Sequence, residues 1–500
     1  MGVIVRQSFW NSIWSYLGIA LGYINLVILF PKFLSTDEFG LTRIFIAASM
    51  IVAQFGALGL INISVKYFPY FKSKDDNHHN GFLFFGFIIT TIGSLACVLG
   101  LIVFKPYIIS TYIERSKLFV DYYYWLFPIS IALIYFHQYS VYARVILKSS
   151  LQTFAREFLI RLLHLLAVLL YAFGFVDFDT FVALFVLSYF FNGLFLVIYL
   201  AFDKALNYIP SWGFYKNLPL KEIAQYGAFV ILSNLGGYVA GNVDVLMLGA
   251  MAENGLTDVA IYSVAFYIGN VVNVPIKAVY SIALPIVADA WKNNDLKKIH
   301  NIYKKSSINQ LAIGSLILLG LYANLDNMFS ILPSEYASGR MVVLIIAGSQ
   351  LFNIASGING GIIVNSPYYK YDTLFIVLMI IGNIILNIVF IKMLGFVGAA
   401  VATAVTLILF NVGRIITVKV KSKMQPFSVQ TIYVLIISAV IYGIQMLLPK
   451  LDIMLVDLIV RSALIVLLFV PAIYFFNISE DINQIIRKSL KTVSKLIGNK

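Results

Sequence analysis

The stretch FLFFGFIITTIGSLACVLGLIVF, at residues 82–104, contains no charged side chain and decides the class of this chain. A helix that crosses a hydrocarbon core about 30 Å thick needs roughly 20 apolar residues, because each residue advances the helix by about 1.5 Å. Stretches of this kind recur about fourteen times along the sequence. Since backbone polar groups in lipid must be hydrogen-bonded within their own segment, these stretches predict helices. The predicted fold class is an all-α polytopic membrane protein.

The predicted spans leave almost no sequence for a soluble domain. Of the 500 residues, 60% are hydrophobic and 12% are charged, whereas soluble proteins carry about 25% charged residues. The spans are expected near residues 9–30, 43–65, 81–104, 122–143, 157–176, 180–202, 224–250, 259–288, 308–331, 339–364, 373–391, 396–413, 429–448 and 455–476.

The net charge of +13 follows the predicted topology. With the N-terminus in the cytoplasm, about 26 of the 36 Lys and Arg residues fall on the cytoplasmic side and about 8 on the outside. The positive-inside rule expects this bias, so the basic charge is explained without a nucleic-acid partner. An even number of spans places both termini in the cytoplasm.

Two segments of the chain repeat one pattern. Each has a Gly-x-x-x-Gly pair followed three places later by a polar residue: Gly18, Gly22 and Asn25 in the first, and Gly237, Gly241 and Asp244 in the second. The repeat predicts two pseudo-symmetric six-helix lobes at 1–203 and 204–424, then two appended spans at 425–476. Residues 477–500 are predicted to form a basic amphipathic tail on the inner leaflet or a solvated tail. Parallel halves of this kind usually bind a transported substrate between them.

Polar residues inside the spans are the candidate site residues, because they are costly in lipid. Asp244, with Asn25 at the matching depth, is expected either to bind a coupling cation or proton or to sense substrate, or to make a buried hydrogen bond that closes the outer gate. Lys277 follows Pro275, which removes a helical hydrogen bond, so it is a candidate anion site. The alternative for Lys277 is snorkelling to the cytoplasmic interface. The glycine pairs and Pro275 are expected to serve helix packing and kinking.

Other basic residues fall at the predicted span ends and are interpreted mainly as topology anchors: Arg43, Lys66, Arg144, Arg161 and Lys392. Among them, Lys66 and Arg144 could receive an anionic head group at the cytoplasmic mouth. Arg461 is expected to snorkel outward or to line a groove. His137 and His164 are interpreted as core histidines, since they lack metal-ligand spacing.

The sequence contains no signature of catalysis, of a cofactor or of a metal site. It has no glycine-rich phosphate loop, no paired carboxylates and no zinc motif. The single cysteine, Cys97, cannot form a disulfide within the chain. These observations favour a transporter over an enzyme, and the short outward loops argue against a membrane glycan polymerase.

Three motifs resemble those of a known family. The segment GNIILNIVFIKMLGFVGAAVAT at 382–403, the loop PKFLSTDEFGL at 31–41 and Ala283-Leu284-Pro285 before a basic loop resemble polysaccharide exporters and oligosaccharide flippases. That family, which is O-antigen-unit-flippase-like, belongs to the multidrug/oligosaccharidyl-lipid/polysaccharide exporter (MOP) superfamily. The resemblance covers essentially the whole chain.

The resemblance implies a function and its partners. Such proteins move polyprenyl-pyrophosphate-linked oligosaccharides across the bacterial inner membrane, for lipopolysaccharide O-antigen, capsule or exopolysaccharide synthesis. The implied partners are the lipid-linked substrate, membrane lipids, a polysaccharide polymerase and chain-length machinery. Lys277 is the best match for a cavity cation. Lipid II flippases look richer in arginine in spans 1, 2 and 8, which argues against a peptidoglycan precursor. A multidrug antiporter of the same fold is the alternative.

Overall fold

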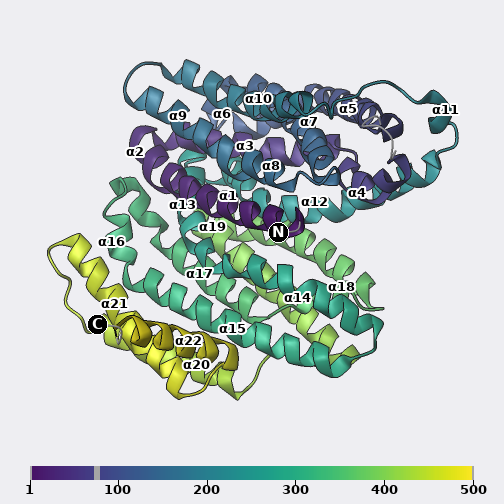
Figure 1. Ribbon diagram of the computed structural model, residues 1–500. Coiled ribbons are helices and arrows are strands. Elements are labelled where there is room, and N and C mark those ends of the chain that lie inside the picture. Colours follow the sequence, from purple (N-terminus) through teal and green to yellow (C-terminus); the bar gives the residue numbers. More distant parts are fainter. Residues whose placement is uncertain (1–2, 73–78, 498–500) are drawn as a thin grey trace. The chain divides into compact units, whose positions relative to one another are not determined.

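The computed structural model describes residues 3–72 and 79–497, and this part of the chain is helical without strands. Clustering of contacts divides the chain into two compact units, Met1–Ser263 and Val264–Lys500. The elements of each unit are labelled in Figure 1. The result confirms an all-α polytopic fold.

The described part of the N-terminal unit is built from long helices, with π-helical segments within two of the helical runs. Its principal elements are α1 (Val3–Tyr23), the π-helix η1 (Ile24–Leu29), α2 (Phe30–Phe33), α3 (Thr36–Gly56), α4 (Leu60–Phe71), α5 (Phe82–Tyr112), α6 (Lys117–Asp121), α7 (Leu126–Val145), α8 (Ser149–Thr153), the π-helix η4 (Phe154–Leu159), α9 (Ile160–Ala172), α10 (Phe178–Phe202), α11 (Trp212–Tyr215), α12 (Leu220–Met251) and the first part of α13 (Leu256–Gly269).

The unit boundary lies after Ser263, whereas the sequence repeat predicts a lobe boundary at 203/204. The difference arises because α12 packs against α3 and is bonded to the loop region after α5. The Tyr112 hydroxyl donates to the Leu246 carbonyl at 2.8 Å, and the Ser116 hydroxyl donates to the Gly249 carbonyl at 2.6 Å. These contacts hold α12 in the N-terminal unit.

The capping of α3 explains why Ser35 and Glu38 occur in the loop at 31–41. Ser35 and Glu38 form a capping box, in which the Ser35 hydroxyl accepts from the Glu38 amide and the Glu38 carboxylate accepts from the Ser35 amide. The two bonds satisfy amides that the first helical turn leaves without partners. Helix α3 therefore begins at Thr36, seven residues before the predicted start of its span.

The C-terminal unit contains α14 (Pro275–Lys292), α15 (Leu296–Ala323), α16 (Leu325–Phe329), α17 (Arg340–Ala355), α18 (Asn359–Val364), α19 (Tyr369–Ser422), α20 (Val429–Met446), α21 (Met454–Phe475) and α22 (Glu480–Ile497). The predicted amphipathic tail is the helix α22. Lys305 on α15 pairs with Glu480 at 3.4 Å, and Asn309 donates to Asp481 at 2.8 Å, so α22 begins against α15. The side chains of Lys491 and Lys495 lie outside the described residues.

The motif at 382–403 joins two predicted spans within α19. Gly395 breaks the helix with φ 59° and ψ −139°, a backbone conformation that suits glycine. Across this break, the Asn383 amide donates to the Thr403 hydroxyl at 3.2 Å. A Cβ at Gly398 would overlap the Phe390 carbonyl, so the two halves of α19 meet closely. The asparagines, glycines and threonine of the motif thus serve a tight helix–helix turn.

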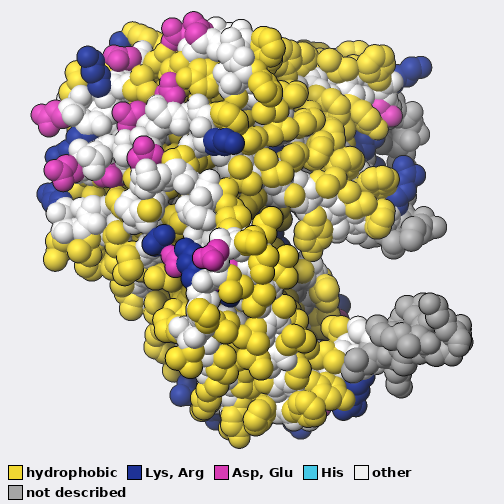
Figure 2. Space-filling model, turned by 90° about the vertical axis from the view of Figure 1, so that its left-hand side faces the viewer, with side chains coloured by type: hydrophobic (Ala, Val, Ile, Leu, Met, Phe, Trp, Pro, Cys, Tyr) yellow, Lys and Arg dark blue, Asp and Glu magenta, His cyan; other side chains and the backbone are white. Residues whose placement is uncertain are grey.

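The helices of the structure fit a membrane environment. Within the described ranges, nine are long and apolar enough to cross a bilayer, and the bent pair Leu256–Asn273 and Pro275–Lys292 adds a tenth. Hydrophobic side chains cover most of the face in Figure 2, and Lys, Arg, Asp and Glu lie mostly toward its margins. The 54-residue helix α19 contains two of the predicted spans, and the number of fourteen spans stays a prediction.

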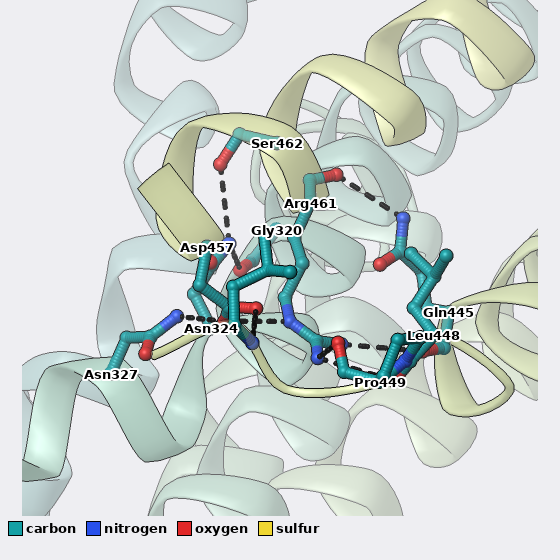
Figure 3. Close-up of polar contacts among 10 residues, drawn as sticks. Gly320, Asn324, Asn327, Gln445, Leu448, Pro449, Asp457, Arg461 and Ser462 are labelled. Carbon is teal, nitrogen blue, oxygen red and sulfur yellow. Dashed lines mark hydrogen bonds and ion pairs between the residues drawn. The ribbon is translucent and has the colours of Figure 1, made fainter. Parts of the chain in front are cut away.

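A buried ion pair within α21 lies beside the contact between the two appended helices, α20 and α21. The Arg461 guanidinium donates to Asp457 at 2.7 Å and to the carbonyls of Gln445 and Pro449 in the preceding helix end and turn, as Figure 3 shows. Asp457 also accepts from Asn327 of α16 at 2.6 Å. Protein partners therefore hold Arg461 at the α20–α21 turn, with Asp457 one helical turn before it. Its reach toward the outer interface stays a prediction.

Candidate functional site

A cavity of about 310 Å³ lies within the N-terminal unit. Its walls come from η1, α3, α7, η4 with α9, α10 and α12. The polar side chains that line it are Asn25, Arg43, His137, Arg156, Arg161, His164, Tyr189, Asn192, Tyr238 and Asn242. The described lining includes three arginines and neither Asp nor Glu. Within a membrane-spanning bundle, cationic side chains that face a cavity mark a site for an anionic group.

Two π-helical segments border this cavity. Such segments insert an extra residue into a helix and occur often at functional sites. Asn25 lies in η1 and lines the cavity, and its amide donates to the Arg161 carbonyl at 2.7 Å. The π-helix η4 contains Arg156 and leads directly into α9, which carries Arg161.

Gly18 gives α1 its close approach to η4. A Cβ at Gly18 would overlap both the Glu157 carbonyl and the Arg161 guanidinium, so a side chain there requires one of them to move. Asn25 lies two helical turns further along the same helix run and contacts the same partner segment. Helix α1 is thus fixed to the arginine-bearing segment at two levels.

The arginines of this segment share one carboxylate. Glu157 pairs with Arg156 at 3.2 Å and with Arg161 at 3.1 Å. The Arg161 guanidinium also donates to the Glu157 carbonyl at 2.7 Å. The side chain of Arg156 is 53% exposed and that of Arg161 is 27% exposed, whereas the Glu157 side chain is 17% exposed. The two guanidinium groups are therefore accessible from the cavity, and their shared carboxylate is partly covered.

Several buried atoms of the cavity wall have no hydrogen-bond partner among the described residues. They are Asn25 Oδ1, Asn192 Oδ1 and His164 Nε2, on side chains that are at least nine-tenths buried. Buried polar atoms in folded proteins almost always have a partner, which can be water or a ligand. The cavity wall therefore suits a hydrated site or a polar ligand.

The glycines predicted for packing have different surroundings. Gly18 contacts η4 closely, and Gly22 is buried in the cavity wall. Gly241 is exposed, and a Cβ there would meet no atom within 4 Å, so the structure contradicts close packing at this position. The physical reason is that Gly241 lies on a face of α12 without a neighbouring backbone. The surroundings of Gly237 lie outside the described residues.

Asp244 makes a buried hydrogen bond. The Tyr262 hydroxyl donates to its carboxylate at 2.6 Å, and the Asp244 side chain is not among those that line the cavity. Its 4% exposure and its place on α12 match the second of its two predicted roles. A role in ion coupling stays a prediction.

The other predicted cations do not line this cavity. Lys277 is exposed in the first turn of α14, which Pro275 begins after a bend of 42°. Lys66 lies over the Tyr226 ring at 4.1 Å, and the Arg144 guanidinium donates to Gln152 at 3.0 Å. Among the sequence-predicted substrate residues, the cavity therefore includes Asn25 alone.

The sequence interpretation missed the arginines of the cavity. Arg43 and Arg161 are predicted as anchors at span ends, but α3 begins at Thr36 and the helical run of α9 begins at Ser149. Both residues therefore lie inside their helical runs rather than at the helix starts, and their role as topology anchors stays a prediction. The signal that could have found the site is the pattern Arg156-Glu157-x-x-x-Arg161, in which a lone carboxylate stands between two cations at helical spacing.

The argument from the arginine content of spans 1, 2 and 8 against a peptidoglycan precursor stays a prediction.

Comparison of the structure with solved structures identifies the fold. The chain superposes on the lipid II flippase MurJ in an inward closed conformation with a TM-score of 0.72, at 14% identity over 94% of this chain and 99% of that one. It superposes on an inward-facing multidrug resistance MATE family transporter of the MOP superfamily with a TM-score of 0.65, at 12% identity over 85% of this chain and 98% of that one. The chain therefore shares the fold of these two structures.

Sequence comparison of this MOP-fold chain gives distant relatives. No model of a known protein family matches it. It is 25% identical over 189 residues to the probable low-salt glycan biosynthesis flippase Agl15 of Haloferax volcanii, a match that spans 37% of this chain and 39% of that protein. It is 20% identical over 414 residues, 80% of each chain, to the uncharacterized membrane protein MJ1068 of Methanocaldococcus jannaschii. The fold and the apolar helices support a multi-pass membrane protein.

Proposed function

We propose that this protein is a flippase for lipid-linked oligosaccharides and that the N-terminal cavity receives the phosphate-bearing end of the lipid. The observation that carries the proposal is the lining of the cavity, with Arg43, Arg156 and Arg161 and no carboxylate among its described residues. Arginine presents planar, permanently charged donors that match phosphate oxygens. Three of them in one membrane-embedded cavity are suited to bind a phosphate or pyrophosphate group.

The physical task of such a protein explains why it needs a polar cavity. A glycan head group cannot cross hydrocarbon unaided, because its hydroxyl groups and charges would lose their water. A cavity that opens in turn to each side of the membrane avoids this loss. The protein then acts as a carrier rather than an enzyme.

The comparisons support this proposal at a coarser level. Agl15 is described as a probable glycan biosynthesis flippase and MurJ as a lipid II flippase. From the sequence resemblance, we extend the proposal to a polyprenyl-pyrophosphate-linked unit of a surface polysaccharide. In this proposal the protein lies in the cytoplasmic membrane, with both termini inside, and supplies a polysaccharide polymerase on the outer face.

A multidrug antiporter is the second candidate function, because a MATE transporter shares the fold. A cavity for cationic drugs would favour acidic and aromatic side chains. The described lining of the N-terminal cavity has the opposite charge. The arginines therefore favour an anionic substrate.

A reconstitution experiment tests the proposal. The purified protein is placed in vesicles that contain a fluorescent polyprenyl-pyrophosphoryl oligosaccharide, and external dithionite destroys the fluorescence of the outer leaflet. We expect the wild-type protein to expose the inner-leaflet probe and the double variant Arg43→Gln/Arg161→Gln to leave that probe protected.

The matched control is Arg340→Gln. Arg340 lies at the surface of the C-terminal unit, 46% exposed and 3.3 Å from Asp326, so the same chemical change occurs away from the cavity. Full transport by the double variant would exclude the cavity as the site. Transport of a cationic dye, without transport of the lipid probe, would support the antiporter.

A further inference from the structure

The carboxylate of Glu157 lies beside the cavity and pairs with two of its arginines. Glu157 lies next to Arg156 in η4 and one turn before Arg161, and its two carboxylate oxygens each pair with one of these arginines. Glu157 is not among the residues that line the cavity, whereas both of its partners are. The carboxylate therefore pairs with both guanidinium groups without itself lining the cavity.

This arrangement has an electrostatic consequence. Two guanidinium groups that face one small cavity repel each other in a medium of low dielectric constant. A carboxylate between them relieves that repulsion while the cavity holds no anion. An anion that enters the cavity must draw the same N–H donors away from Glu157, so its binding is opposed by the two ion pairs that it weakens.

The exposure of the groups shows which one can exchange partners. Arg156 has one ion pair with Glu157 and more than half of its side chain exposed. Arg161 is less exposed and is also held by a hydrogen bond to the Glu157 carbonyl. Arg156 can therefore turn from the carboxylate to a ligand, while Arg161 stays in place.

We propose that Glu157 is an internal counter-ion that competes with the substrate phosphate for Arg156 and Arg161 and thereby sets the affinity of the cavity. This inference rests on the proposed function, since it concerns the same site. Arg156 and Arg161 place two guanidinium groups at the cavity. A pyrophosphate diester carries two negative charges near neutral pH and a phosphate diester carries one, so the pyrophosphate linkage offers one charge to each of these two groups.

Binding measurements with two short-chain probes test the proposal. The probes are citronellyl-pyrophosphoryl-N-acetylglucosamine and citronellyl-phosphoryl-N-acetylglucosamine, titrated into the full-length protein in detergent. We expect the wild-type protein to prefer the pyrophosphoryl probe. We expect Glu157→Gln to lower the Kd of that probe on the order of tenfold, because the competitor is gone. Glu157→Asp keeps the charge but shortens the side chain, and an intermediate Kd is expected.

The direction in which the Kd changes in Glu157→Gln shows whether Glu157 competes with the probe or only supports the arginines. If Glu157 only positions the arginines, Glu157→Gln loosens them and raises the Kd, which would overturn the proposal. An unchanged Kd would overturn it as well. The thermal unfolding midpoint of each variant shows whether the fold is intact, and the Glu157→Asp titration decides the question if the Gln variant does not fold.

A control variant and the binding of the wild-type protein distinguish failure of the proposed role of Glu157 from failure of the proposed function. Asp326→Asn changes the net charge by the same amount at a surface pair of the C-terminal unit, and we expect it to leave the Kd unchanged. If the wild-type protein binds neither probe, the proposed function itself is refuted. If it binds the pyrophosphoryl probe and Glu157→Gln does not tighten binding, only the role of Glu157 is refuted.

Discussion

The arginines of the two units have different surroundings. In the C-terminal unit, Arg414 pairs with Asp372 at 2.7 Å and Arg461 with Asp457 at 2.7 Å, and each of the four side chains is at most 15% exposed. In the N-terminal unit, Arg156 and Arg161 share Glu157 beside an open cavity. One carboxylate for each buried arginine indicates a structural pair, whereas one carboxylate for two cavity arginines leaves positive charge for a ligand.

This comparison separates stability from transport. Removal of one partner from a buried ion pair leaves a charge without compensation and costs about 3–5 kcal/mol. Removal of a half-exposed cation costs about 0–1 kcal/mol. We therefore expect variants in the C-terminal pairs to unfold the protein more easily and variants in the cavity to impair binding.

The largest loss of stability is expected for Asp457→Asn. The change leaves the buried Arg461 without its carboxylate, and we expect the free energy of unfolding to fall by about 3–5 kcal/mol. Denaturant unfolding in detergent measures the loss. The double variant Asp457→Leu/Arg461→Met removes both charges and should recover most of it. If the single variant is as stable as the wild type, the pair is not structural.

A smaller loss is expected for Gly18→Ala. The added methyl group overlaps the Glu157 carbonyl and the Arg161 guanidinium, and overpacking of this kind costs about 1–3 kcal/mol. Because Arg161 must move, binding of the pyrophosphoryl probe should weaken as well. Gly241→Ala is the matched control, since a Cβ at that position meets no atom within 4 Å. Equal stability of the two variants would refute the close approach of α1 to η4.

For Arg156→Gln we expect the clearest difference between the effect on stability and the effect on transport. Its side chain is half exposed, so the free energy of unfolding should change by about 0–1 kcal/mol, whereas lipid transport in vesicles should be largely lost. Both quantities are measured on the same preparation. Preserved transport would show that Arg156 is a surface charge and not a part of the site.

The smallest change in stability is expected for Lys277→Ala, because Lys277 is exposed at the start of α14. The sequence predicts that this variant impairs export of surface polysaccharide at a normal protein level. Export in a complemented deletion strain, with the protein quantified by immunoblotting, checks this prediction. Unchanged export would remove Lys277 from the site.

The sequence predicts the fold well because the fold follows from apolar runs. Residues 373–391 and 396–413 are predicted as two spans, and the break at Gly395 lies between them. The capping pair Ser35 and Glu38 is visible in the sequence as Ser-x-x-Glu. Such local patterns determine where helices begin, end and turn.

The site is predicted poorly because it depends on where helices begin. Hydropathy places the start of one span near 157, although the helical run begins at Ser149 and passes through the π-helix η4. That shift places Arg161 well inside the helical run instead of near its start. Arg461 shows the same limit, because its role follows from Asp457 one turn earlier rather than from its depth. The repeat likewise relates Gly241 to Gly22, but only Gly22 is buried.

The hydrogen bond from Asn25 to the Arg161 carbonyl joins residues 136 positions apart. During synthesis, α1 enters the bilayer long before the ribosome has made its partner. Until then the Asn25 amide has no access to that carbonyl, and a polar group in lipid favours interaction with the insertion machinery. A nascent chain that ends before residue 161 should therefore cross-link to the translocon through α1, and a chain that extends past α9 should be released.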